Sequence, residues 1–426
     1  MRITQASAHL TREKLAAPFG FKGSTLTELW QVAVLLETDA GVSGGGVGVQ
    51  SVLWSDPDTF AAFGEEESNR RMLTVTERAL DMLRGMEVTT PPEMTGRLAE
   101  ALLPEAARLT GRGEVPPTFV LNALVGADFA LWQLWDRERG DGTFDGIIRA
   151  FCPELAAVRQ NALGVIPLLS YFSPDEQIIR LLDDGAALLK IKIGQSASSP
   201  QEMVEKDLAR LAHIHALAGA RCTSYTDCGH PVYYLDANGR YPNRETLEAF
   251  LDGAARIGAL DRIILLEEPF APGSETEVRG LPVRVTGDES AHSAQDVTRL
   301  TGKMGYGAIA LKPIAKTLSV SLEMARQAMR NGAVCFCADL TVPPVMLDWN
   351  MSMASRLPLL PGMKVGVVES NGSQNYPEWK RLDGLCPVPD APWRTPEAGV
   401  FHLGERFFSD SGILRIPDAY FPDHSP

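Results

Sequence analysis

The pattern of apolar and polar positions changes near residue 160. Before that point, residues 1–10 and 29–48 alternate between apolar and polar positions and are interrupted by glycine, which predicts antiparallel strands. Apolar residues at helical spacing then recur in three segments, 68–87, 92–111 and 118–137. A group of strands followed by a group of helices predicts an α+β domain over residues 1–158.

From residue 159 to residue 372, short apolar runs alternate with seven segments of helical spacing, which is typical of parallel βα units. Eight such units predict a closed (β/α) barrel of modified TIM type. Residues 373–426 are rich in proline, glycine and aromatic residues, and we expect them to pack back on the first domain. The predicted barrel strands are VIPLLSYF, ALLKIKIG, CTSYTDCG, IILLEEPF, VRVTGDES, GAIALKPI, AVCFCADL and KVGVVESN.

One connection is longer than the others. Residues 230–243, HPVYYLDANGRYPN, follow the third predicted strand, and the Asn238-Gly239 pair in this segment resembles a hairpin turn. The segment is therefore interpreted as an insertion at the barrel mouth.

Composition narrows the classes of partner. The chain has 426 residues, 45% of them hydrophobic, enough for two globular domains with a large core. A net charge of −14 with no basic block argues against nucleic acid or an anionic membrane as partner. The six cysteines lack zinc or redox spacing, and residues 1–20 lack the features of a signal peptide. These observations predict a reduced, cytoplasmic protein that acts on small molecules.

Ionisable residues stand at the ends of the predicted strands. Three successive strands end in Asp227, Glu267 and Asp288. In a parallel barrel these ends meet on one face, where three carboxylates would repel each other unless a cation neutralised them. Oxygen ligands favour Mg²⁺, with Mn²⁺ as the alternative.

Lysines flank these acids on both sides. Lys190 and Lys192 lie two apart on one strand, so both side chains leave the same face, and Lys312 ends the strand after Asp288. A single charged residue at a strand end is as often part of a salt bridge at the barrel rim as part of a functional site. Six of them on consecutive strands favour a functional site instead.

The order Lys-x-Lys, Asp, Glu-Glu-Pro, Gly-Asp-Glu-Ser and Lys resembles the enolase superfamily, specifically its muconate-lactonizing-enzyme-like branch in the mandelate racemase/muconate lactonizing enzyme family. The stretches LWQVAVLLETDAGVSGGG and ADFALWQLWDRERG are similar to the capping domain of that family. The resemblance implies that Lys192 and Lys312 are the acid/base pair and that Lys190 holds the substrate carboxylate. It also implies three metal ligands, Asp227, Glu267 and Asp288.

Three further stretches bear on substrate binding. FGFKGSTLTE reads locally as a hairpin connection, but the resemblance places Phe19 and Phe21 on a capping loop over the site. The last strand ends in Glu369-Ser370-Asn371, where dipeptide epimerases of the family tend to carry Asp-x-Asp for the substrate ammonium. Glu369 alone is the candidate for that role, and Asn371 is a candidate substrate-binding residue. The family commonly has Asp-x-Asn after the third strand, whereas Asp227 is followed by Cys228 and Gly229.

The chemistry follows from these groups. Removing a proton next to a carboxylate adds negative charge to the substrate, and Mg²⁺ stabilises the resulting enediolate. Lysines on opposite faces can remove and return the proton, which predicts a racemase or epimerase of small carboxylates. The resemblance implies the dipeptide epimerase or N-acylamino acid racemase type. The alternatives are a lyase of the same family (acid-sugar dehydratase, o-succinylbenzoate synthase or cycloisomerase) and a non-catalytic carboxylate-binding barrel. Homo-oligomerisation stays open.

Overall fold

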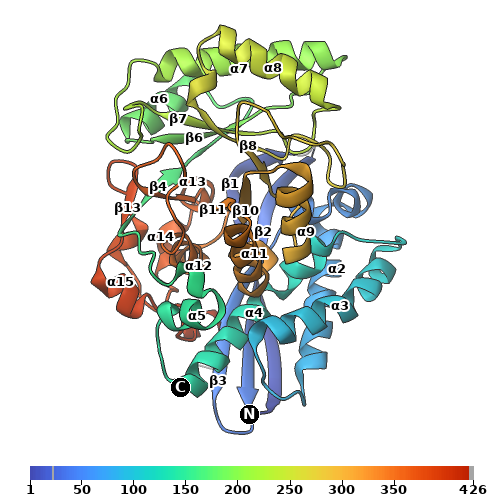
Figure 1. Cartoon of the computed structure of the whole chain (residues 1–426). Helices are drawn as coiled ribbons and strands as arrows, with labels where there is room; N and C mark the ends of the chain where they lie inside the picture. The colour runs from blue at the N-terminus through green and yellow to red at the C-terminus, as the bar shows by residue number, and fades with distance from the viewer. Residues whose placement is uncertain (22–23, 422–426) are drawn as a thin grey trace.

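The N-terminal part of the chain is built on a three-stranded antiparallel sheet in the order β1-β2-β3. The computed structural model describes residues 1–21 and 24–421. Its first strands, β1 (Ile3–Phe21) and β2 (Ser24–Thr38), form a long hairpin, and β3 (Ser43–Gln50) completes the sheet. In Figure 1 this blue hairpin runs from the N-terminus toward the barrel strands. The predicted strands at 1–10 and 29–48 are confirmed.

Four helices follow the sheet: α1 (Val52–Ser55), α2 (Pro57–Leu83), α3 (Pro91–Thr110) and α4 (Pro117–Arg139). The three long ones confirm the predicted helices. Helix α4 packs directly on β3, and the glycines of that strand allow the close approach. A Cβ on Gly44 would clash with the backbone oxygen of Ala130, and one on Gly46 would clash with that of Gly126.

Parallel strands form the second sheet, in the order β13-β4-β12-β11-β10-β9-β8-β7-β6-β5. Strands β4 and β5 stand at distant places in this order, yet only Pro167 separates them in the chain. β4 pairs with β12, and β5 pairs with β6, so this one bent segment closes the sheet on itself. The predicted barrel is therefore confirmed, with eight strand positions and an added antiparallel strand, β13, beside β4.

The strands that form the barrel positions are β4 (Ala162–Ile166), β5 (Leu168–Leu169), β6 (Leu188–Lys192), β7 (Val232–Asp236), β8 (Ile263–Glu267), β9 (Val285–Gly287), β10 (Ala308–Leu311), β11 (Val334–Cys337) and β12 (Gly366–Glu369). The helices of this region are α5 (Phe144–Phe151), α6 (Asp175–Asp183), α7 (Pro200–Ala218), α8 (Arg244–Arg256), α9 (Ala294–Thr298), α10 (Pro313–Lys316), α11 (Leu318–Arg330) and α12 (Pro344–Ala354).

Two expectations for the barrel are wrong. The third strand is not CTSYTDCG but VYYLD, residues 232–236, which was interpreted as part of an insertion. All five residues of β7 are buried, as in a strand covered on both faces. In addition, residues 268–284, all of them described, contain no helix between β8 and β9. Three prolines and two glycines in that segment disfavour one.

The C-terminal segment contacts both parts of the chain. It contains α13 (Gly372–Asn375), α14 (Trp379–Asp383), β13 (Val400–His402) and α15 (Glu405–Asp410). Gln133 Nε2 on α4 donates to the backbone oxygens of Ile413 (2.9 Å) and Arg415 (2.8 Å), while β13 pairs with β4. The domain boundaries at residues 158 and 372 stay a prediction.

Helix α11 begins at a buried acid from the N-terminal part. Oδ2 of Asp128, on α4, accepts hydrogen bonds from the backbone nitrogens of Leu318 (2.9 Å) and Ser319 (3.2 Å).

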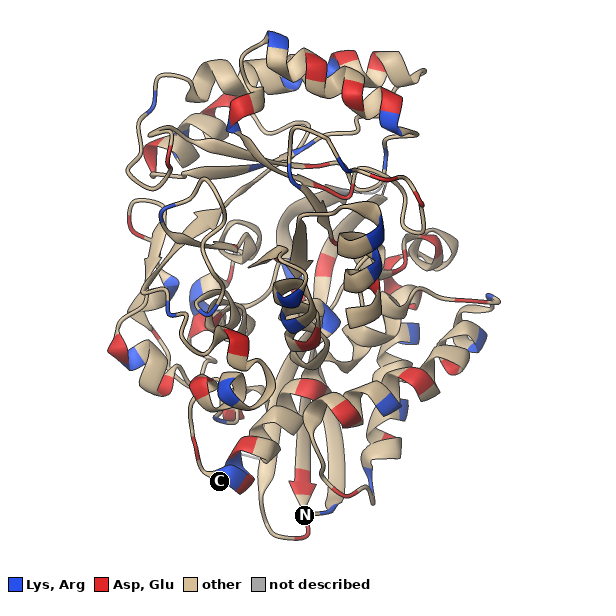
Figure 2. Cartoon of the chain, viewed as in Figure 1, with Lys and Arg blue, Asp and Glu red and all other residues tan. Residues whose placement is uncertain are grey.

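Acidic and basic residues are interspersed along the outer helices α7 and α8 (Figure 2). Among the helices of the described residues, none combines the length and the apolarity needed to cross a membrane.

Candidate active site

The carboxyl ends of the barrel strands bring together the charged residues that the sequence places there. Because the strands are parallel, these ends meet on one face of the barrel. β6 and β10 are separated by three strands along one side of the closed sheet and by three strand positions along the other, so their ends lie across the barrel from each other. The residues at these ends are Lys190 and Lys192 (β6), Asp236 (β7), Glu267 (β8), Asp288 (after β9), Lys312 (after β10) and Glu369 (β12).

Asp227 is not part of this group, which corrects its placement at a strand end. Its side chain is exposed, and its backbone nitrogen donates to the oxygen of Gly362 at 3.0 Å, in the segment that precedes β12. It therefore lies at the opposite, amino end of the strands. Asp236 is the acid at the carboxyl end of β7, and Asn238 follows it with the Asp-x-Asn spacing that Asp227 lacks.

Lys190 lies between three carboxylates. Its Nζ is 3.0 Å from Glu267 Oε2, 3.1 Å from Asp236 Oδ2 and 3.2 Å from Glu369 Oε2. Burial alone would lower the pKa of Lys190, but these carboxylates outweigh it and hold the pKa well above its usual value. Lys190 is therefore a fixed positive charge.

Lys192 leaves the same strand and contacts the next one. Its Nζ donates to Asp236 Oδ2 at 2.6 Å and to Asn238 Oδ1 at 2.6 Å. Burial would raise the pKa of Asp236, yet Lys192 and Lys190 together lower it to about 2. The amide of Asn238 also donates to Glu289 Oε1 at 3.2 Å, which fixes the orientation in which it faces Lys192.

Asp288 is held by two lysines that follow the neighbouring strand, β10. Lys312 Nζ is 2.6 Å from its Oδ2, and Lys316 Nζ is 2.8 Å from its Oδ1. Against the effect of burial, these cations keep the pKa of Asp288 well below its usual range. Burial opposes charge on Lys312 as well, but Asp288 and Glu267 raise its pKa. The Lys312 ammonium also lies 4.5 Å from the centre of the Trp54 ring, from the N-terminal part of the chain.

The acids of this site fit a divalent cation. Glu267 is fully buried and neither of its oxygens makes a hydrogen bond, although Lys190 lies near one of them. Burial raises the pKa of Glu267 to about 7, so a further cation would relieve an unfavourable charge. Oxygens of Glu267, Asp288 and Glu289 all lie within 4.8 Å of one another. Such an all-oxygen set suits Mg²⁺ or Mn²⁺.

A cavity that is partly open to solvent contains this site. The hairpin of the N-terminal sheet forms one wall through Leu15, Phe19, Leu26 and Leu29. Six carboxylates line the cavity against three ammonium groups, so its charge balance is negative. The side chain of Phe21 lies outside the described residues. The carboxylates are Asp236, Glu267, Asp288, Glu289, Asp339 and Glu369, and the ammonium groups are Lys190, Lys192 and Lys312.

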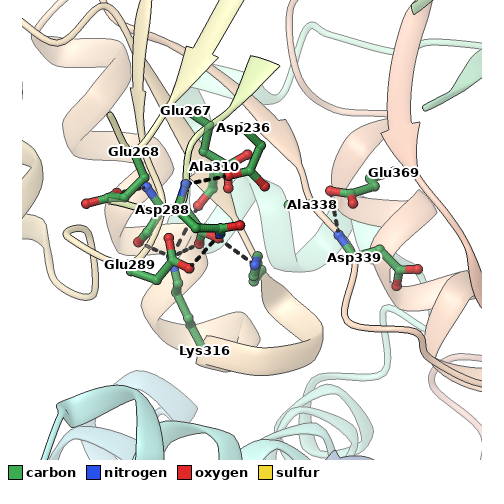
Figure 3. A network of polar contacts seen from close by, with 12 residues as sticks. Asp236, Glu267, Glu268, Asp288, Glu289, Ala310, Lys316, Ala338, Asp339 and Glu369 are labelled. Carbon is green, nitrogen blue, oxygen red and sulfur yellow. Dashed lines mark hydrogen bonds and ion pairs between the residues drawn. The ribbon is translucent and has the colours of Figure 1, made fainter. Parts of the chain in front are cut away.

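The ends of β11 and β12 form another wall of this cavity. Glu369 Oε2 accepts from the backbone nitrogen of Asp339 (3.2 Å), and Asp339 Oδ2 accepts from that of Asn371 (2.8 Å). Figure 3 shows Asp339 and Glu369 apart from the cluster around Asp288. Oδ1 of Asp339 and Oδ1 of Asn371 are buried without a hydrogen-bond partner. Burial and Glu369 raise the pKa of Asp339 to about 6. The two unpartnered oxygens are acceptors for a ligand with N–H or O–H groups.

Three residues of the site were missed in the sequence. Asp236 could have been identified from the sequence, because it follows an apolar run and begins an Asp-x-Asn motif. Asp227, nine residues earlier, was predicted as the acid of this strand instead. Lys316 is four residues beyond Lys312, a spacing that could have suggested a shared helical face. Asp339 follows the apolar run AVCFCA, so it had the same signal as the other acids.

Comparison with known proteins supports the fold. No family model matches the sequence, and no curated protein matches it. Solved structures match over most of the chain. A mandelate racemase/muconate lactonizing protein from Herpetosiphon aurantiacus is 17% identical, with a TM-score of 0.65 over 95% of this chain and 96% of that chain.

Two epimerase structures are similar to the chain to the same degree. The dipeptide epimerase from Enterococcus faecalis, solved with Mg and the dipeptide L-Leu-L-Tyr, is 16% identical, with a TM-score of 0.63 over 95% of this chain and 98% of that chain. The L-Ala-D/L-Glu epimerase from Bacillus subtilis is 16% identical, with a TM-score of 0.63 over 88% and 92%. The chain therefore has the fold of these mandelate racemase/muconate lactonizing and epimerase structures, a (β/α) barrel with an N-terminal α+β domain.

Proposed function

We propose that this protein is a Mg²⁺-dependent racemase or epimerase that removes the proton α to a substrate carboxylate. One observation carries the proposal: Lys192 and Lys312 lie at the ends of strands on opposite sides of the barrel, with the acids of the site between them. A substrate carbon placed between these lysines can be approached from both faces. We propose Glu267 and Asp288 as metal ligands, as the sequence suggested, with Asp236 in place of Asp227.

Each part of the site has a role in this reaction. The bound Mg²⁺ would supply positive charge that stabilises the enediolate form of the substrate. Lys190 remains charged among its three carboxylates and is positioned to attract the substrate carboxylate. The apolar side chains of the hairpin, including Phe19, keep water from the reacting carbon.

The proton moves between the substrate and the two lysines. In one direction, the neutral amine of one lysine takes the α-proton, and the electron pair of the broken C–H bond moves into the carboxylate. The ammonium of the opposite lysine then delivers a proton to the other face, and the carbon is inverted. Lys312 is suited to deliver a proton in the arrangement seen, because its raised pKa keeps it charged at neutral pH.

We propose that the wall of Asp339, Glu369 and Asn371 binds the end of the substrate that lies away from its carboxylate. Glu369 already contacts Lys190 and the Asp339 backbone, so Asn371 and Asp339 provide the unused acceptors. Phe19 is proposed to cover the substrate, and Phe21, whose side chain is outside the described residues, keeps that role as a prediction. The substrate is proposed to be a small carboxylate with hydrogen-bond donors.

Exchange of the α-proton with solvent tests the function. Dipeptides, N-acylamino acids and acid sugars are incubated with the Mg²⁺-loaded protein in D₂O, and the α-proton signal is followed by NMR together with the optical rotation. We expect loss of the signal with inversion for at least one class, and neither in the Glu267→Gln variant. Exchange followed by loss of water would indicate a lyase instead. A folded protein that neither binds Mg²⁺ nor exchanges any of these substrates would contradict the proposal.

A further inference from the structure

Lys316 is fully buried next to the acid cluster, and the proposed reaction does not use it. It ends α10, and its Nζ contacts the backbone oxygen of Asp288 at 2.7 Å, Asp288 Oδ1 at 2.8 Å and the backbone oxygen of Ala310 at 3.5 Å. An ammonium group has three donors, and here each has an acceptor. In Figure 3 the Lys316 side chain points toward Asp288.

The two lysines on Asp288 differ in their access to the cavity. Lys312 lines the cavity and contacts Oδ2, whereas Lys316 is not among the described residues that line it. Lys316 also contacts backbone oxygens of the β9 and β10 segments, so it cannot leave without exposing them unpaired. Lys316 therefore occupies Oδ1 from the side away from the cavity, and Oδ2 is the oxygen that faces the cavity.

We propose that Lys316 is a positioning residue that determines metal selectivity. Because Lys316 occupies Oδ1 of Asp288, only Oδ2 is left to bind the cation. Mg²⁺ takes six ligands in a strict octahedron, and a carboxylate normally offers it one oxygen. Ca²⁺ is larger and accepts both oxygens of one carboxylate. With Oδ1 held by Lys316, Asp288 fits the smaller ion and denies the larger one its second oxygen.

The selectivity of binding separates this role from a purely structural one. The inference rests on the cation site of the proposed function, but its test needs no turnover. Binding of Mg²⁺ and of Ca²⁺ is measured by calorimetry for the unmodified protein, for Lys316→Met and for Lys303→Met. The second variant removes the same charge from an exposed lysine that pairs with Glu275 at the surface.

We expect Lys316→Met to weaken Mg²⁺ binding by roughly 10- to 100-fold, the usual effect of removing a group that orients a metal ligand. Ca²⁺ binding should weaken far less, because Asp288 can then turn and offer both oxygens. Lys303→Met should leave both affinities unchanged. Equal losses for the two ions would indicate a structural role, and equal gains would indicate a simple charge effect; either result overturns the proposal.

A measurement on the unmodified protein covers the case in which Lys316→Met does not fold. In a crystal structure with Mg²⁺ bound, we expect Lys316 to keep its contact with Oδ1 and the ion to bind Oδ2 alone. Coordination of Mg²⁺ by both oxygens, or by Oδ1, would overturn the inference while leaving the proposed function intact. If the unmodified protein binds no divalent cation, it is the proposed function that fails.

Discussion

Lys192 Nζ and Asp236 Oδ2 lie 2.6 Å apart, on neighbouring strands that pair at these two residues. This contact joins a candidate base to the acid at the end of β7. It also shows which acid of the segment between α7 and α8 belongs to the site. Asp227, in the same segment, is exposed at the other end of the barrel.

Two matched variants test this assignment. Asp236→Asn should lower Mg²⁺ affinity by more than about 100-fold, since even groups that only orient a metal ligand contribute roughly 10- to 100-fold. Asp227→Asn should leave Mg²⁺ affinity and turnover unchanged. Calorimetry of both variants, with circular dichroism as a check on folding, measures the difference. The reverse pattern would restore the acid chosen from the sequence.

The sequence predicted most of the barrel because apolar runs that end in charge are a local signal. Glu267, Asp288 and the lysines of β6 and β10 were located in this way. For the third strand this signal is ambiguous, since CTSYTDCG and VYYLD each carry an acid at or near their end. Pairing with β6 and β8, a contact between distant segments, decides between them.

Other parts of the site depend on tertiary contacts alone. Lys316 is placed by a helix of four residues, α10, that points its last side chain back at Asp288. The acceptors of Asp339 and Asn371 become significant only because β11 and β12 are neighbours and leave two oxygens without partners. The four-residue spacing of Lys312 and Lys316 is a hint in the sequence, but it does not show that both lysines meet Asp288.

The hairpin wall gives a prediction for substrate affinity. Phe19 is half-buried and lines the cavity, so Phe19→Ala removes part of an apolar contact worth about 1 kcal/mol and should raise KM about fivefold. Mg²⁺ affinity should not change. Phe172→Ala is the control, because this side chain is 88% exposed. Equal KM values for all three proteins, with every accepted substrate, would assign the hairpin a connecting role only.

Asp128 gives a prediction for the pH dependence of stability. Burial raises its pKa to about 6, against the hydrogen bonds that it accepts from Ser319, Thr95 and Leu318. Because the folded-state pKa exceeds the unfolded one, stability from this group is present below about pH 4 and is lost as the pH rises through about 6, by about 3 kcal/mol at most.

Asp128→Asn should remove this loss. An asparagine can keep an acceptor toward the α11 backbone and direct its amide at the two hydroxyl groups. Urea unfolding of both proteins between pH 4 and pH 7 measures the difference, and subtraction cancels the other titrating groups. If the stability difference between the two proteins stayed constant across that range, the account of Asp128 would be wrong.

The two lysines provide the most direct test of the central claim, that the site works on both faces of one carbon. Lys192→Ala and Lys312→Ala are each compared with the unmodified protein, using both enantiomers of an accepted substrate in D₂O. We expect each variant to lose inversion by at least roughly 10²- to 10⁴-fold, the effect of removing a positioned acid or base. Each should still exchange the α-proton of one enantiomer, and the two variants should retain opposite enantiomers. Near-normal inversion by Lys312→Ala, or exchange of the same enantiomer by both variants, would contradict the account.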